Sequence, residues 1–147
     1  MNPDNPAFIS PENEQVQTDV PGPTVTMRLD YGRPPLTANG REHWRTKERL
    51  AKNLRTAAVW AARSSHVPEY PRIHVSLVWV VNDRRRRDGG ENLAPTLNPL
   101  IDGLVDAGVV ADDDPQHVIR DMPTIRYEAG SRPHLELTVG PVLEVAA

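Results

Sequence analysis

The chain has 147 residues, 38% hydrophobic and 25% charged, a size and composition that predict one globular domain. Its net charge of −3 argues against a protein that coats nucleic acid non-specifically, although local charge rather than the sum steers a polyanion. The absence of cysteine excludes disulfides, thiolate metal sites and cysteine nucleophiles. Because no apolar run has membrane-spanning length and no signal-peptide pattern opens the chain, we expect a soluble cytoplasmic protein without a membrane partner.

The first third of the chain predicts an arm, a strand and a long helix. Residues 1–23 are rich in proline and polar residues, which predicts a disordered N-terminal arm ahead of a single domain at residues 24–147. Alternating apolar residues predict a strand over 24–30. After a loop rich in turn-forming residues, helical spacing of apolar side chains predicts a helix over 41–65, with basic residues on its other side.

The remaining elements complete an alternating order. Apolar alternation predicts a strand over 72–81. A helical pattern over 93–107 is interrupted by Pro99, so that either Asn98 caps a helix starting at Pro99 or the helix is kinked there. Three short strands are expected at Val109-Val110, 118–127 and 134–142. The order β-α-β-α-β-β predicts an α+β domain with a mixed sheet and two helices packed against one face.

Aromatic residues and histidines give weaker signals. The three tryptophans, Trp44, Trp60 and Trp79, are expected in the core, and Trp60 is also suited to a dimer contact because it lies off the main apolar stripe. A chain this small buries a modest fraction of its surface, so dimer formation would stabilise it. The five histidines lack the spacing of a zinc site.

The most informative stretch lies between residues 84 and 114, where basic and acidic side chains are adjacent. Four consecutive arginines precede Asp88, and Glu91 follows after a Gly-Gly step. Asp112 and Asp113 come after the next helical segment, which returns the chain toward the first acids. Carboxylates are the ligands that Mg²⁺ prefers, and the guanidinium fork suits phosphate. The stretch therefore predicts a site where a metal and a phosphodiester meet, with Asp88, Glu91, Asp112 and Asp113 as metal ligands.

Five short segments occur in a fixed order within this stretch: Asp83 to Asp88, Glu91-Asn92-Leu93, Asp102-Gly103-Leu104, Ala107-Gly108-Val109 and Asp112-Asp113. Together with Pro34-Pro35, Asn39 and the basic helix upstream, they resemble the RusA family of Holliday-junction resolvases over roughly residues 24–140. That family consists of small, mostly phage-derived, dimeric, magnesium-dependent endonucleases. The resemblance implies a RusA-like nuclease domain, a homodimer, Mg²⁺ with Mn²⁺ able to substitute, four-way branched DNA as the partner, and a phage or prophage origin.

The resemblance also implies roles for individual residues. Asp88, Glu91 and Asp113 match the family's three catalytic acids, and Asp112 is the neighbour of the third. Asn92 matches the asparagine after the second acid, and Asp102 matches the aspartate on the helix. DNA contacts are expected from seven basic residues: Arg41, Arg45, Lys47, Arg84, Arg85, Arg86 and Arg87.

The chain departs from the family pattern at three points. Gly89-Gly90 stands where the family has one residue, the second acid is Glu91 rather than aspartate, and Asn98 replaces a lysine. Without this lysine, the chain lacks a phosphate contact or a positive charge that stabilises the transition state. An arginine of the run is a candidate to supply that charge instead. Two alternatives to a nuclease therefore stay open: a catalytically weakened or inactive branched-DNA-binding protein, and a small interaction module with a charged face.

Overall fold

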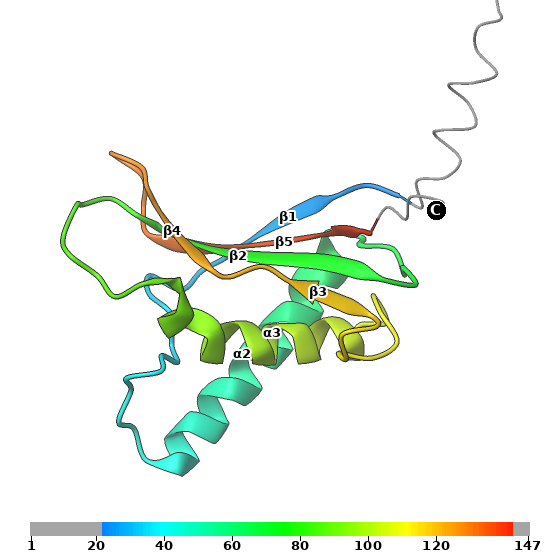
Figure 1. Ribbon diagram of the computed structural model, residues 1–147, viewed down its shortest axis with the longest axis horizontal. Coiled ribbons are helices and arrows are strands. Elements are labelled where there is room, and N and C mark those ends of the chain that lie inside the picture. Colours follow the sequence, from blue (N-terminus) through cyan, green and yellow to red (C-terminus); the bar gives the residue numbers. More distant parts are fainter. Residues whose placement is uncertain (1–21, 143–147) are drawn as a thin grey trace, which may run out of the picture.

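The computed structural model describes residues 22–142, and these form an α+β fold with a five-stranded mixed sheet. The predicted fold class is confirmed, including the packing of both helices on one face of the sheet (Figure 1). The predicted N-terminal arm lies outside the described residues, apart from its last two. In chain order the elements are β1 (Val25–Leu29), α2 (Trp44–Ser64), β2 (Ile73–Val81), the short 3-10 helix η2 (Gly90–Leu93), α3 (Ala94–Asp106), β3 (Val118–Arg120), β4 (Thr124–Tyr127) and β5 (His134–Pro141).

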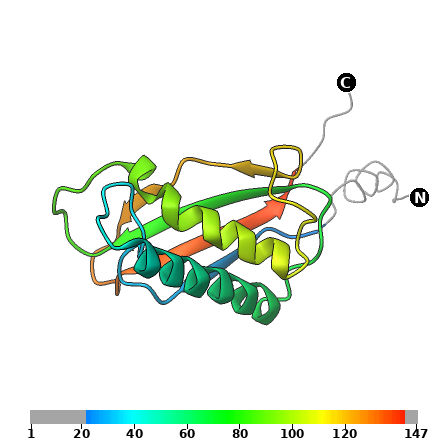
Figure 2. The ribbon, with the colours of Figure 1, turned by 90° about the horizontal axis from the view of Figure 1, so that it is seen from below.

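The sheet is ordered β1-β5-β2, with β3 and β4 both paired to β2. β5 runs antiparallel to its two neighbours, whereas β3 and β4 run parallel to β2. The register places Leu137 of β5 opposite Met27 of β1 on one side and Leu77 of β2 on the other, and all three side chains are buried. Because alternate side chains point to one face of a strand, this row faces the helices, and the core lies between the two layers (Figure 2).

The helical layer forms because α2 and α3 bury apolar sides against the sheet and against each other. On α2 the buried side holds Leu54, Ala58 and Ala62, which recur at helical spacing. The crossing with α3 depends on Gly103, where an added Cβ would lie 2.3 Å from the Arg55 carbonyl oxygen. Within residues 22–142, no helix has the length and apolar character needed to cross a membrane.

α3 continues through Pro99, which decides between the two interpretations of this segment. The helix begins at Ala94, directly after η2, so Asn98 is not its N-cap. Pro95 occupies the first turn of α3, where its missing N–H needs no partner. Pro99 removes one hydrogen bond inside the helix, but Leu100 beside it is fully buried, so core packing holds the helix together there.

Two predictions for the second half of the sheet are wrong. The Val109-Val110 pair forms no strand; both side chains are buried in the turn after α3, and the first carbonyl accepts a 2.8 Å hydrogen bond from the Tyr70 amide. The predicted strand over 118–127 is broken at 121–123, because Pro123 has no N–H to give to the ladder. β2 therefore pairs with β3 and with β4 as two separate strands.

The tryptophans do not all lie in the core as predicted. Trp79 is half-buried and packs against the core, but Trp44 and Trp60 are 61% and 63% exposed. A helix turns about 100° per residue, so Trp60 lies roughly 200° around α2 from the buried Ala58. Trp60 therefore lies off the buried stripe of α2, whereas Trp44 is exposed because it is the first residue of the helix, well before the first buried residue, Leu54.

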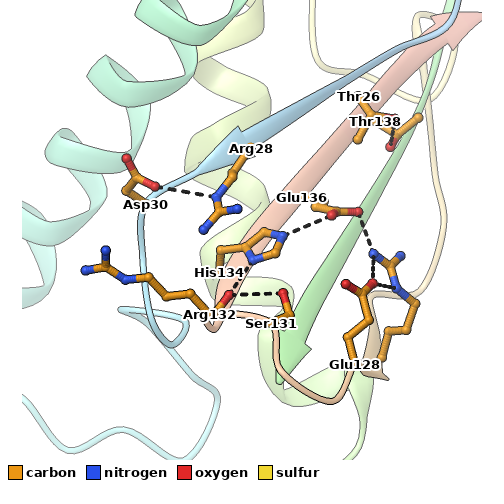
Figure 3. A network of polar contacts seen from close by, with 10 residues as sticks. Thr26, Arg28, Asp30, Glu128, Ser131, Arg132, His134, Glu136 and Thr138 are labelled. Carbon is orange, nitrogen blue, oxygen red and sulfur yellow. Dashed lines mark hydrogen bonds and ion pairs between the residues drawn. The ribbon is translucent and has the colours of Figure 1, made fainter. Parts of the chain in front are cut away.

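The sheet face away from the helices carries a chain of polar contacts (Figure 3). His134 lies at its centre, with 5% of its side chain exposed. The His134 Nδ1 atom is 2.7 Å from the Arg132 carbonyl oxygen, and the Nε2 atom is 3.0 Å from the Glu136 carboxylate. Glu136 also accepts a 3.0 Å bond from Arg126 of β4. The bonds from His134 and Arg126 lower the pKa of Glu136, and the His134 bond contributes most. The bond from Arg126 also links β4 to β5 across β2.

Candidate functional site

The arginine run lies in the loop that follows β2, and Arg87 sets the shape of this loop. The Arg87 guanidinium donates to the Asp83 carboxylate at 2.6 Å, and to the carbonyl oxygens of Asp83 and Arg85 at 3.2 and 2.9 Å. It also lies over the Trp79 ring, 5.1 Å from the centroid, and 17% of its side chain is exposed. The bond from Arg87 lowers the pKa of Asp83. Arg87 therefore holds the loop together, and little of it is free for DNA.

The other three arginines of the run are exposed to solvent. Arg84 lies over the Tyr127 ring of β4, 4.3 Å from its centroid. The Arg85 side chain is 78% exposed, and Arg86 lines an open cavity beside the loop. A guanidinium that stacks on an aromatic ring keeps its N–H groups available at the edge of that ring. These three side chains therefore match the predicted phosphate-binding role better than Arg87 does.

The cavity beside this loop brings basic and acidic residues together. It has a volume of about 420 Å³ and is open to solvent. Its lining residues are Arg33, Pro34, Thr37, Trp79, Arg86, Arg87, Asp88, Asn92 and Leu93. Asp88 thus shares one concave surface with Arg33 and Arg86. Arg33 was not predictable from the sequence, because an isolated arginine in a proline-rich loop carries no signal of its own.

Asp88 is fixed by the loop that precedes α2. The Asn39 side-chain amide donates to the Asp88 carboxylate at 2.9 Å. Asn92 holds the same loop through two hydrogen bonds. Its side-chain oxygen accepts a 3.1 Å bond from the backbone N–H of Asn39, and its backbone carbonyl accepts a 3.0 Å bond from the backbone N–H of Ala38. Buried Thr96 bonds both backbone groups of Leu36. The predicted site residue Asn92 is therefore a structural bridge, and Asn39, for which no site role was predicted, contacts the predicted catalytic aspartate directly.

Of the two glycines ahead of Glu91, Gly90 is required by close packing. An added Cβ at Gly90 would lie 1.6 Å from the Pro123 carbonyl oxygen, so η2 approaches the break between β3 and β4 too closely for any other residue. An added Cβ at Gly89 would lie 2.8 Å from the Glu91 carboxylate oxygens, because that carboxylate folds back over Gly89. Glu91 itself is exposed. Gly90 therefore lets η2 pack against the sheet, whereas the contact at Gly89 is with a flexible side chain that can move away.

The second group of predicted acids lies near the other end of α3. Partial burial raises the pKa of Asp102, the Arg55 guanidinium opposes this, and the neighbouring Asp113 carboxyl raises it further. Asp112 is exposed, and its carboxylate accepts the Asp113 amide at 2.7 Å. The Asp113 carbonyl oxygen accepts a 3.3 Å bond from Arg120 of β3.

The predicted metal ligands therefore fall into two groups within one chain. Asp88 and Glu91 precede α3 in the chain, whereas Asp112 and Asp113 follow its end. The 13 residues of α3 extend about 20 Å at 1.5 Å per residue. Within residues 22–142, no three acidic or histidine side chains gather in a group that fits a metal ion. A metal site at these four acids stays a prediction.

The remaining basic residues lie at the start of α2. Arg41 is exposed just before the helix, and the Arg45 guanidinium lies 5.3 Å from the centroid of the Trp44 ring. Lys47 lines a second open cavity of about 600 Å³, which it shares with Asn98 and Asp102. Thr37 borders both this cavity and the one that holds Asp88. Of the predicted DNA-binding residues, Arg86 and Arg87 thus line the first cavity and Lys47 lines the second.

No protein-family model matches the chain, and no curated protein matches its sequence. The fold and the site therefore define the class by themselves: an α+β protein with an arginine-rich loop beside an open, aspartate-bearing cavity.

Proposed function

We propose that this protein is a magnesium-dependent, structure-specific endodeoxyribonuclease of the RusA type that resolves four-way DNA junctions in recombination and repair. The main support is the cavity in which Asp88 lies beside Arg33 and Arg86. A phosphodiester in this cavity would meet guanidinium donors for its charged oxygens and a carboxylate within the same surface. The exposed Arg84 and Arg85, which precede Arg86 in the same loop, would hold the adjacent backbone without reading base sequence.

A divalent metal fits the donor set of this proposal. Asp88 and Glu91 offer carboxylate oxygens, and Mg²⁺ commonly takes one or two carboxylates from the protein with waters and phosphate oxygens as its other ligands. When bound, the ion supplies positive charge that polarises the phosphoryl group. In the proposed reaction, water attacks phosphorus in line with the leaving 3′ oxygen, and Arg33 and Arg86 balance the charge that develops on the phosphate.

A homodimer is part of the proposal for two reasons. Resolution requires two symmetric nicks, and a twofold dimer presents two equivalent sites. In addition, Asp112 and Asp113 follow the end of α3 opposite to Asp88 and Glu91. A second copy is a simple way for the third catalytic acid to reach the site.

A branched-DNA-binding protein without strong nuclease activity is the second candidate. Asn98 favours it, because this residue brings no positive charge to the cavity that it shares with Asp102. Glu91 favours it as well, since its carboxylate folds over Gly89. In this case the arginines would bind the junction while hydrolysis stayed slow.

Cleavage of an end-labelled four-way junction in Mg²⁺ separates the two candidates. The nuclease proposal predicts paired nicks by the wild-type protein and none by Asp88→Asn, with equal junction binding by both. Salt-dependent binding with no cleavage, and cleavage only after Asn98→Lys, would support the binding protein. Equal cleavage by wild type and Asp88→Asn would refute the assignment of Asp88.

A further inference from the structure

Trp44 presents its ring to solvent at the first residue of α2, and its neighbours hold it there. The ring is 61% exposed. The His43 ring lies 5.7 Å away at a tilt of 31°, and the Arg45 guanidinium lies 5.3 Å from the indole centroid. His43 also caps the helix, because its Nδ1 atom accepts a 3.2 Å bond from the Arg45 amide. Trp44 is therefore an exposed ring on a fixed backbone, flanked by an aromatic ring and a cation.

The cavity beside Trp44 suits a neutral, planar group better than a phosphate. Its charged lining residues are one base, Lys47, and two acids, Glu48 and Asp102. Two acids against one base disfavour an anion. The Asn98 side-chain amide adds a donor and an acceptor to the same wall. A nucleobase has the shape and the hydrogen-bonding groups for such a surface, and every base has a face that stacks on an aromatic ring.

Trp44 and Asp88 line two cavities that share one wall. Thr37 borders both cavities. The segment that forms this wall is fixed by the bonds of Leu36 to Thr96 and of Asn39 to Asp88. A DNA strand whose backbone passes the Asp88 cavity would therefore have an aromatic platform nearby, and the exposed Arg41 beside it can balance the strand's charge.

We propose that Trp44 stacks on an unpaired base of branched DNA, with the base seated in the cavity between α2 and α3. The inference rests on the proposed function, because a branch point is where a duplex offers unstacked bases. It adds a contact that neither the arginine run nor the acids provide. Because it reads a base face rather than a base edge, this contact would favour branched over linear duplex with little sequence preference.

Trp60 provides a matched control for Trp44. It is 63% exposed on the same helix, but it lies 16 residues further along, about 24 Å at 1.5 Å per residue. The experiment compares Trp44→Ala, Trp44→Phe and Trp60→Ala, each combined with Asp88→Asn to prevent cleavage. The probes are a four-way junction and a single-stranded oligonucleotide, each carrying one 2-aminopurine, placed at the branch in the junction. Circular dichroism checks that each variant is folded.

We expect Trp44→Ala to weaken binding of both probes by roughly 5- to 150-fold, the range for loss of one base–aromatic stack. It should also abolish quenching of 2-aminopurine, while Trp44→Phe retains part of both effects and Trp60→Ala changes neither. Equal affinity and equal quenching for Trp44→Ala and Trp60→Ala would overturn the inference alone, leaving the proposed function intact. Absence of salt-dependent junction binding by the parent protein would overturn the proposed function and this inference with it. A monomer–dimer shift caused by Trp44→Ala, with quenching unchanged, would assign the ring to a second copy of the chain instead.

Discussion

Thr96→Val tests whether the loop before α2 is held to α3 by a single hydroxyl. Thr96 is fully buried, and its Oγ1 atom accepts a 3.1 Å bond from the Leu36 amide and donates a 2.6 Å bond to the Leu36 carbonyl. Valine has almost the same shape but can make neither bond. Each buried backbone group left without a partner costs about 1–3 kcal/mol. We therefore expect Thr96→Val, which leaves two such groups unpartnered, to lower the free energy of unfolding by about 2–6 kcal/mol.

Thr96→Ser is the control for this substitution. It keeps the hydroxyl and removes one buried methyl group, for which we expect a loss of about 1 kcal/mol. Urea unfolding followed by circular dichroism measures both variants, and the slope m should be unchanged because the same surface becomes exposed. If Thr96→Val were as stable as Thr96→Ser, the two bonds would not hold the loop, and the argument for a rigid wall between the two cavities would fail.

Three further predictions concern the loop after β2 and the polar network of Figure 3. Gly90→Ala should destabilise the protein by about 1–3 kcal/mol, measured by urea unfolding, because the added Cβ meets the Pro123 carbonyl; unchanged stability would contradict this close approach. Arg87→Ala should speed amide hydrogen exchange over residues 84–88 and weaken junction binding more than Arg85→Ala, although Arg85 is more exposed; the reverse order would assign Arg87 to direct phosphate contact. The pKa of Glu136 is lowered in the folded protein, so its contribution to stability is full above the ordinary glutamate range near pH 4.3 and is lost as pH falls through the lowered value. Glu136→Gln should therefore reduce the loss of stability in acid unfolding, and an unchanged pH profile would contradict this role.

Local sequence patterns predicted the elements that bury one regular face. The alternation over β2 and the helical spacing over α2 each report a single side facing one core, and both elements lie close to their predicted bounds. The charged stretch after β2 was equally visible, because Arg86 and Asp88 are adjacent in sequence and both line the same cavity. Such features depend on neighbours along the chain, which a sequence contains directly.

Features that depend on distant partners were not predictable. Arg87 resembles the three arginines before it, and only the folded loop shows that it pairs with Asp83 and lies over Trp79. The apolar side chain of Val109 is buried in the turn after α3, not in a strand. Asn39 contacts Asp88 across 49 positions of sequence. Each of these outcomes depends on which segments meet in space, and side-chain type alone does not determine that.

The central claim is that the Asp88 cavity hydrolyses the phosphodiester of a DNA junction. Its most direct test is the single-turnover rate of junction nicking in Mg²⁺, measured for wild type and Asp88→Asn at matched junction occupancy. We expect similar occupancy for both proteins and a nicking rate about 100-fold or more lower for Asp88→Asn, the scale on which catalytic groups contribute. Equal rates for the two proteins, or a wild-type protein that binds the junction and never nicks it, would contradict the claim.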